Sequence, residues 1–365
     1  MQLIRSRPGH MPGWVASVLV VFLAACTSGT SPAATTAPPA SSVAPTSGAS
    51  TQPSSLAPAS GGPSQAPSIV AKSNYKIAMV SGQSTDPFFV TQAAGAKAEA
   101  LKLGVTLNWQ APNEFDPSLQ IPILDSIFAS KPQFLIVHPT DKTALVAELK
   151  KFTAAGIPVI TTGADVVDPT ARLGFLASDN TAGGMLEATA LSTALGPAGG
   201  KVMLITCPPG VPCGDERKDG FETGVKANPS LNYVGFQLYN GSDTTDAVRV
   251  MAAELQKVPD LVGVAASDGS SGLGAATAIN EAGKSSTIKV VTFDAGPDLV
   301  AALKKGWVSA LMIQQSYAIG AQAVDFAVEY LNGGFTVPQK TTFPLIVGTA
   351  ANIDSPELAK DLYGP

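Results

Sequence analysis

Charged residues, histidine and arginine are scarce in this sequence. Only 14% of its 365 residues are charged, two are histidine, and the formal net charge is −5. A chain with so little histidine is poorly equipped for acid–base chemistry at neutral pH, so we expect no catalytic residue, no cofactor and no metal site, with an enzyme as the weaker alternative. The sequence contains no basic stripe, which argues against nucleic acid as a partner.

A hydrophobic run long enough to span a membrane is also missing near the start of the chain. Two arginines precede an apolar run at 14–25, which is shorter than the roughly 20 residues that a spanning helix needs. Small residues end the run, as in a secretory signal peptide, which we place at 1–25. The tetrapeptide at 23–26, Leu-Ala-Ala-Cys, resembles a bacterial lipobox and predicts lipidation of Cys26. An ordinary signal with an incidental cysteine is the alternative.

Residues 27–71 contain no Asp, Glu, Lys or Arg and consist mainly of Ser, Thr, Pro, Ala and Gly. Such a composition buries too little apolar surface to offset the entropy of ordering. We therefore expect a disordered tether at 26–73 that holds a folded body outside the cytoplasm, anchored by lipid to the cell membrane.

From residue 74 onward, short apolar segments alternate with helical patterns. The first unit comprises a strand at 76–80, a polar loop, the helix start Asp86-Pro87, a helix at 87–103 and Gly104 as its cap. Further strands are predicted at 106–109, 134–137, 158–161, 202–206, 233–238, 261–265 and 289–293. Continuous apolar strands between helices predict parallel sheets covered on both faces. A single closed barrel is the alternative.

Two open lobes fit the sequence better than a barrel, because the extended stretch 172–180 interrupts the alternation and a second group of units then restarts. Open α/β sheets bind ligands at the carboxyl ends of their strands.

Several short motifs occur in a characteristic order along the body of the chain. They are DPFF at 86–89, PVIT at 158–161, ASDN at 177–180 followed by GG at 183–184, ERKDGF at 216–221, SDG with GLGA at 267–275, FDAGPD at 293–298, and Gln314. With these motifs the chain resembles the periplasmic sugar-binding proteins of the ribose-binding type, which are the substrate-binding components of ABC importers.

The resemblance implies an α/β fold, the two-lobed periplasmic-binding-protein fold of type I, in which each lobe is a parallel sheet flanked by helices. Three crossover hinges would lie near Ser178, Gln314 and Val347. Lobe one would comprise 74–178 plus 315–346, and lobe two 179–314 plus 347–365. Ligand binding would close the lobes, and the closed form, which we expect to be a monomer, would dock on the permease with its ATPase.

The resemblance also implies a ligand set. Sugar recognition needs carboxylates and amides for the hydroxyls and aromatic faces for the C–H surfaces of the ring. The residues implied are Asp86, Phe88, Phe89, Asp268, Asp294 and Gln314. Each has a plain structural reading as well, since the aspartates can cap helices and the phenylalanines can be core.

The chain departs from the ribose pattern at two places. Gly163 stands where an aspartate usually chelates hydroxyls, with Asp165 two residues on, and Asp215 replaces an arginine. Arg217 matches a different arginine, one that we interpret as structural. With so few arginines to clamp an anion, we expect a neutral polyhydroxylated ligand, such as a small sugar or a sugar alcohol.

Further candidates for the cleft are polar or aromatic residues near strand ends, namely Ser81, Trp109, His138 and Asn240. Cys207 and Cys213 bracket a proline-rich loop, and outside the cytoplasm such a pair favours a disulfide.

Two rival functions remain. The same lobes could present a signal molecule, such as a furanosyl autoinducer, to a membrane receptor, or the chain could be a tethered adhesin. A transcription regulator with this fold would carry a DNA-binding headpiece in place of the signal and tether.

Overall fold

The computed structural model describes residues 69–240 and 243–364, all of which belong to one compact unit of the chain, Gln65–Pro365. The expected signal peptide at 1–25, the expected lipidation site Cys26 and the expected tether up to residue 68 lie outside the described residues. Within the described part, no helix is both long enough and apolar enough to cross a membrane.

The first strand–loop–helix unit forms as its sequence predicts. β1 (Lys76–Val80) is buried from its second residue onward. α1 (Pro87–Leu103) begins where the Asp86 carboxylate accepts a hydrogen bond of 2.8 Å from the Phe88 N–H, and a proline fills the first helical position, where no N–H is needed. The helix ends at Gly104, whose φ of 71° is a left-handed conformation that glycine adopts without strain.

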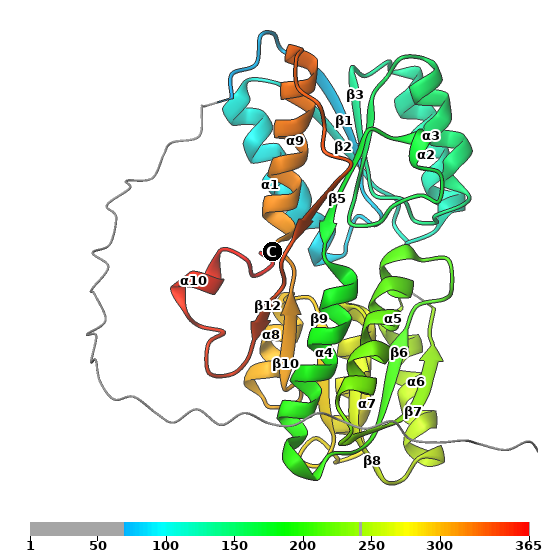
Figure 1. Cartoon of the computed structure of the whole chain (residues 1–365), viewed down its shortest axis with the longest axis vertical. Coiled ribbons are helices and arrows are strands. Elements are labelled where there is room, and N and C mark those ends of the chain that lie inside the picture. The colour runs from blue at the N-terminus through cyan, green and yellow to red at the C-terminus, as the bar shows by residue number, and fades with distance from the viewer. Residues whose placement is uncertain (1–68, 241–242, 365) are drawn as a thin grey trace, which may run out of the picture. The chain divides into compact units, whose positions relative to one another are not determined.

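The first sheet, the core of lobe one, is parallel throughout and has the strand order β11-β5-β4-β3-β1-β2 (Figure 1). Its other elements are β2 (Thr106–Gln110), β3 (Phe134–Val137), β4 (Val159–Thr162), β5 (Gly174–Ser178), β11 (Lys340–Phe343), α2 (Pro117–Ala129), α3 (Leu145–Ala154), α9 (Ser316–Asn332) and the 3₁₀ turn η1 (Pro169–Ala171). Ile77 and Met79 of β1 pack in the core with α1 and α9, whereas Ala78 and Val80 pack with α2 and α3. Both faces of the sheet are therefore covered by helices.

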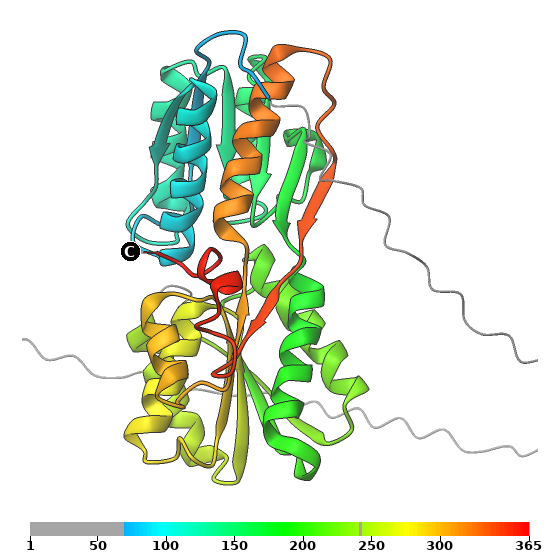
Figure 2. The same ribbon diagram turned by 90° about the vertical axis from the view of Figure 1, so that its left-hand side faces the viewer.

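The second sheet, the core of lobe two, has the strand order β12-β10-β9-β8-β6-β7, with the strands labelled in Figure 1. Figure 2 shows this lobe in the lower half of the molecule. Its elements are α4 (Asn180–Leu195), η2 (Gly196–Ala198), β6 (Gly200–Thr206), α5 (Pro212–Ala227), β7 (Leu231–Leu238), α6 (Thr244–Lys257), β8 (Leu261–Ala266), α7 (Gly269–Glu281), β9 (Lys289–Phe293), α8 (Pro297–Lys304), β10 (Ala310–Ile313), β12 (Ile346–Gly348) and α10 (Pro356–Ala359). Helices α4 and α5 cover one face, and α6, α7 and α8 cover the other. β12 runs antiparallel to β10, so this sheet is not wholly parallel as expected. The reason is that β12 follows β11 directly and enters from lobe one.

Three crossovers connect the lobes, which confirms the predicted two-lobed fold. β5 leads through Asp179 into α4, β10 leads through Gln314 into α9, and β11 leads through Pro344 into β12. The first two lie at the predicted places, whereas the third precedes the predicted Val347, which already belongs to β12. Because each lobe has its own open sheet, the single closed barrel is excluded.

Candidate ligand-binding site

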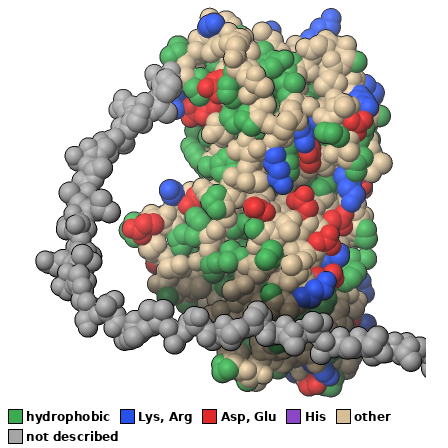
Figure 3. All heavy atoms as spheres, in the orientation of Figure 1, with side chains coloured by type: hydrophobic (Ala, Val, Ile, Leu, Met, Phe, Trp, Pro, Cys, Tyr) green, Lys and Arg blue, Asp and Glu red, His purple; other side chains and the backbone are tan. Residues whose placement is uncertain are grey.

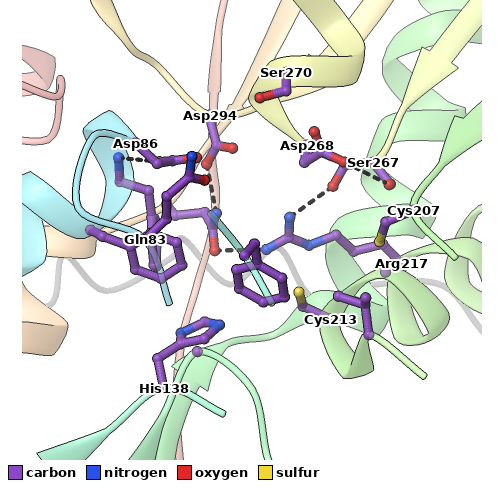
Figure 4. Close-up of a pocket in the computed structure, with 17 residues that line it drawn as sticks. Gln83, Asp86, His138, Cys207, Cys213, Arg217, Ser267, Asp268, Ser270 and Asp294 are labelled. Carbon is purple, nitrogen blue, oxygen red and sulfur yellow. Dashed lines mark hydrogen bonds between the residues drawn. The ribbon is translucent and has the colours of Figure 1, made fainter. Parts of the chain in front are cut away.

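A cavity lies where the carboxyl ends of the strands of the two lobes face each other (Figure 4). About 610 Å³ of empty space lies within it when the open solvent at its mouth is included. Lobe one lines it with Gln83, Asp86, Phe88, Phe89, Phe115, His138 and Gly163. Lobe two lines it with Cys207, Val211, Cys213, Gly214, Arg217, Ser267, Asp268, Ser270, Asp294 and Gln314. Many of these residues directly follow a strand, because the parallel strands of a sheet end at one edge.

The structure brings together three of the five aspartates that were predicted to contact a ligand. Asp86 comes from lobe one, while Asp268 and Asp294 come from lobe two. Figure 4 shows Asp86 beside Asp294, Asp268 across from them, and His138 on the opposite side of the cavity. The other predicted residues of the same set, two phenylalanines and Gln314, line the cavity as well. Side chains far apart in sequence thus surround one space.

Asp294 accepts three hydrogen bonds of ordinary length. Its Oδ1 accepts from Gln314 Nε2 at 2.7 Å and from the Tyr363 hydroxyl at 2.9 Å, and its Oδ2 accepts from the Gly269 N–H at 2.9 Å. Its backbone φ of 76° is left-handed, a region that aspartate enters more readily than most residues. Three donors therefore fix the orientation of this carboxylate before any ligand arrives.

Asp268 is the N-cap of α7. Its Oδ1 accepts from the Ser271 N–H at 3.0 Å, and the Tyr239 hydroxyl donates to the same oxygen. Burial raises the pKa of Asp268, while these two hydrogen bonds oppose the shift because they favour the ionised form. The helix-cap role and a ligand role are compatible, since the side chain lines the cavity and Oδ2 accepts only one long hydrogen bond, 3.4 Å from Ser267 Oγ.

Asp86 has the most perturbed carboxyl group of the three. Burial, reinforced by the negative charges of Asp294 and then Asp268, raises its pKa to about 7, although the hydrogen bond from the Phe88 N–H works in the other direction. The carboxyl group that caps α1 is therefore partly protonated near neutral pH. Its side chain can act as a hydrogen-bond donor or as an acceptor near neutral pH.

Arg217 is the one cationic side chain among the described residues that line the cavity. Its guanidinium donates to Asn180 Oδ1 at 3.0 Å, to the Ser267 carbonyl at 2.7 Å and to Gln314 Oε1 at 3.0 Å, and it lies 4.0 Å above the Phe293 ring. These contacts agree with the structural role expected of it. They also hold Gln314 in place, and Gln314 Nε2 in turn donates to Asp294 Oδ1.

The two lobes therefore present different surfaces to the cavity. We call the lobe-two set the polar wall; it consists of Arg217, Ser267, Asp268, Asp294 and Gln314. We call the lobe-one set the aromatic wall; it consists of Phe88, Phe89, Phe115 and His138. The rings meet mostly edge to face, with centroids 5.2 Å apart for the two adjacent phenylalanines and 4.7 Å for Phe89 and His138. Such a wall can cover the C–H surface of a sugar ring.

His138 is the polar member of the aromatic wall. It is 4% exposed, and neither ring nitrogen has a hydrogen-bond partner among the described residues. Burial, helped by the charge of Arg217, lowers its pKa to about 3, so the ring is neutral and carries one donor and one acceptor nitrogen. Gly163 lies against this ring with φ 70°, and a Cβ at that position would come within 2.5 Å of it. The place of the aspartate missing at 163 is thus filled by the histidine.

Five other predicted candidates do not line the cavity, namely Ser81, Trp109, Asp165, Asp215 and Asn240. Most of them form hydrogen bonds or ion pairs with other side chains of the protein. Trp109 Nε1 donates to Ser81 Oγ at 2.9 Å, and Asp165 accepts from Arg172 Nε at 2.9 Å. Asn240 is exposed. Asp165, which stands near the place of a missing ribose contact, is thus held by a neighbour within its own lobe.

Asp215 instead contacts the other lobe. Its Oδ2 lies 2.5 Å from Nζ of Lys142, which precedes α3 in lobe one, and the Lys142 N–H donates to the Gly210 carbonyl at 3.4 Å. The residue that stands in place of a ligand-binding arginine thus forms an ion pair across the gap between the lobes.

The expected disulfide between Cys207 and Cys213 is not formed, because both residues are free thiols in the structure. Cys207 follows β6, and its sulfur packs against Gly214. Cys213 belongs to the first turn of α5. Burial raises the pKa of both thiols, which keeps them protonated. Both line the cavity next to Arg217.

Several contributors were missed by sequence reasoning, among them Gln83, Phe115, Ser267, Ser270 and Tyr363. Phe115 precedes Asp116-Pro117, the same helix start as at residues 86–87, and this repeated signal could have located its loop beside the first. Tyr363 lies far from every motif in the sequence, and no local pattern indicates its contact with Asp294.

The fold and the site define a class of protein: a two-lobed α/β binding protein with a cavity for a small ligand between its lobes. Residues 77–334 match the model of the periplasmic binding protein domain. The chain belongs to this family.

Relatives with stated roles resemble the chain over most of its length. The ribose import binding protein RbsB of Bacillus subtilis (strain 168) is 32% identical over 267 residues, which cover 72% of this chain and 83% of that protein. The ABC transporter solute binding protein of Agrobacterium vitis bound with alpha-D-tagatopyranose is 34% identical, with a TM-score of 0.77, covering 80% of this chain and 100% of that one. A carbohydrate transporter solute binding protein of Agrobacterium radiobacter, in complex with D-arabinose, is 27% identical, with a TM-score of 0.75 and coverage of 80% and 100%.

Proposed function

We propose that this protein is the sugar-binding component of an ABC importer. It binds one neutral monosaccharide or sugar alcohol between its lobes and delivers it to the permease. The observation that carries the proposal is the convergence of three carboxylates, from both lobes, on one small cavity with an aromatic wall. Carboxylates accept hydrogen bonds from hydroxyl groups while aromatic rings cover the apolar faces of a sugar, and neither group alone would select one.

The charges of the site favour an uncharged ligand. Asp268 and Asp294 belong to the same cavity as the single cation Arg217, and three of the hydrogen-bond donors of that guanidinium are already used by protein acceptors. A phosphate or carboxylate ligand would have to be desolvated beside these aspartates without a free cation to compensate. Hydroxyl groups meet no such cost.

Import is favoured over the presentation of a signal molecule to a receptor. The relatives described above are named for import or for ABC transport, and none of those names refers to sensing or to an enzyme. A non-catalytic role also agrees with the site, in which the one histidine is neutral and far from its usual pKa.

The proposal includes a location outside the cytoplasm, with a signal peptide at 1–25 and a lipid on Cys26 that tethers a monomeric body to the membrane. Cell fractionation tests this part. The Cys26→Ala variant should appear in the soluble extracytoplasmic fraction while the parent protein stays with the membrane. Equal membrane retention of both proteins would contradict the lipid anchor but not the sugar-binding function.

Thermal-shift measurements followed by titration calorimetry test the binding function. The panel contains D-ribose, D-arabinose, D-tagatose, D-allose, ribitol and, as an anionic control, ribose 5-phosphate. A sugar present at about 100 times its dissociation constant should stabilise the protein by roughly 2.7 kcal/mol. We expect at least one neutral member to do so and the phosphate to have no effect. Binding of the phosphate alone, or of no member of the panel, would contradict the proposal.

A further inference from the structure

The segment that follows α10 returns to the gap between the lobes and places Tyr363 against both of them. Tyr363 is 3% exposed. In lobe two its N–H donates to the Ala295 carbonyl at 3.2 Å and its hydroxyl donates to Asp294 Oδ1 at 2.9 Å. In lobe one its ring packs edge-on against Phe88, with centroids 6.0 Å apart at 72°. One residue thus joins the polar wall to the aromatic wall.

The contact with Asp294 determines which part of that carboxylate a ligand can reach. A carboxylate offers about four acceptor positions on its two oxygens. Gln314 and Tyr363 both donate to Oδ1, whereas Gly269 donates to Oδ2. Oδ1 is therefore saturated, and the remaining position on Oδ2 is left for a ligand hydroxyl. Burial and the charge of Asp294 raise the pKa of the Tyr363 phenol well above its usual value, so this hydroxyl remains a donor.

Tyr363 also lines a second cavity, which shares five residues with the first, namely Gln83, Asp86, Phe88, Ser270 and Asp294. It therefore lies where the two cavities adjoin. A ligand that leaves must separate walls that Tyr363 holds together.

We propose that Tyr363 is a positioning residue for sugar binding, which orients the Asp294 carboxylate through its hydroxyl and ties the closed lobes together through its ring. This inference rests on the proposed function and adds to it a residue that makes no direct contact with the sugar. Its loss should raise the dissociation rate more than it lowers the association rate, because the contacts to both lobes exist together only when the lobes are closed.

The first test measures binding kinetics with the tightest-binding sugar of the panel above. Tyr363→Phe removes only the hydroxyl and should weaken affinity about tenfold, mainly through faster dissociation. Tyr363→Ala also removes the ring and should weaken it further. The matched control is Tyr75→Phe, because Tyr75 is a buried tyrosine in lobe one whose hydroxyl donates to Asn332 Oδ1 at 3.0 Å and which does not line the cavity. This control should lower the melting temperature without altering the dissociation constant.

The second test is spectroscopic and follows sugar binding by the protein without substitutions; a variant is needed only to assign a signal. The chain has 6 tyrosines, so fluorotyrosine incorporation gives few ¹⁹F signals, and Tyr363→Phe identifies the one that belongs to Tyr363. Saturation with the sugar should shift that signal and leave the Tyr75 signal in place. If the sugar binds but the Tyr363 signal does not move and Tyr363→Phe binds with parental affinity and dissociation rate, the inference is overturned while the proposed function stands. If no sugar of the panel binds, both are overturned.

Discussion

The polar wall and the aromatic wall face the same cavity but are organised in opposite ways. In the polar wall nearly every group has a partner: Asp294 accepts three hydrogen bonds, and Arg217 donates three. In the aromatic wall the rings pack on one another, and His138 has two unpartnered nitrogens among the described residues. Asp86, which also belongs to lobe one but not to this wall, has its pKa raised to about 7 by burial and by the charges of Asp294 and Asp268.

This difference separates two tasks of a binding site. A pre-ordered network loses little conformational freedom when the ligand arrives, so the polar wall can recognise hydroxyl positions at low cost. The aromatic wall contributes shape and apolar contact, and a ligand hydroxyl that reaches His138 can bond to a ring nitrogen that has no partner among the described residues. We therefore expect substitutions in the polar wall to change mainly the affinity for the sugar. Substitutions on the lobe-one side, in the aromatic wall or at Asp86, should change which sugars bind and how the stability of the protein depends on pH.

We expect the largest effect on sugar affinity from Asp294→Asn, which removes a negative charge from the polar wall. Asparagine tolerates the left-handed backbone at this position and can still accept from Gln314, but it loses the charge that strengthens a hydrogen bond to a sugar hydroxyl. We expect a loss of affinity of about 100-fold in titration calorimetry. An alanine at this position would also strand three donors, so it tests folding as much as binding. Affinity of the asparagine variant within twofold of the parent would remove Asp294 from the site.

A smaller effect, of about tenfold, is expected from His138→Phe. The change preserves the aromatic packing and removes both nitrogens, so a sugar hydroxyl that reaches the ring loses its partner, at a cost on the order of 1–3 kcal/mol. Gly163→Ala should act in the same direction, because its Cβ would meet the ring at 2.5 Å. Gly156→Ala is the matched control: its φ of 78° imposes the same backbone strain, but no atom lies within 4 Å. If His138→Phe binds sugars unchanged, the ring is only packing.

A pH effect on stability should arise from Asp86. Its pKa is raised to about 7 in the folded protein, so between pH 4 and 7 the folded state binds a proton that the unfolded state has lost. The free energy of unfolding should fall as pH rises through this window, and each unit of pKa shift corresponds to about 1.4 kcal/mol. Asp86→Asn should flatten this slope in urea titrations.

Asp116 provides the control for that titration. It caps α2 as Asp86 caps α1, but hydrogen bonds at Ser118 lower its pKa. Asp116→Asn should leave the slope between pH 4 and 7 in place. A parent protein whose stability is flat or rises across the window would contradict the environment assigned to Asp86.

The smallest effect is expected at the rim of the cavity, where Lys142 and Asp215 join the lobes. The two side chains are 36% and 29% exposed, and partly exposed pairs contribute about 0.2–1 kcal/mol. Lys142→Met should weaken sugar binding less than fivefold, and less so at high salt. Breaking the pair Lys201–Asp260 within lobe two should leave affinity unchanged. Equal effects of both changes would show that the pair between the lobes has no role in closure.

The sequence predicted those helix ends and strands that are determined by residues close together in the chain. Asp86 and Gly104 mark both ends of α1, and the strands at 76–80, 134–137 and 289–293 were placed with their observed bounds. The same logic put Asp268 and Asp294 after strands and hence into the cavity. These features depend on hydrogen bonding and burial within a few residues, which a sequence pattern records.

Features that depend on distant contacts were missed. β10, β11 and β12 are only four, four and three residues long, and the last two are partly exposed strands at the edges of their sheets. The pairing of Asp215 with Lys142 and the contact of Tyr363 with Asp294 join residues 73 and 69 positions apart. No local signal specifies such partners, and for this reason Asp215 was expected to face the ligand.

A crystal structure of the complex with the tightest-binding neutral sugar would test the central claim most directly. The account predicts a sugar enclosed between the lobes, with hydroxyls on the carboxylates of Asp86, Asp268 and Asp294 and a ring face on Phe88 or Phe89. A sugar bound elsewhere, or one in this cavity that leaves all three carboxylates without a hydroxyl partner, would contradict it.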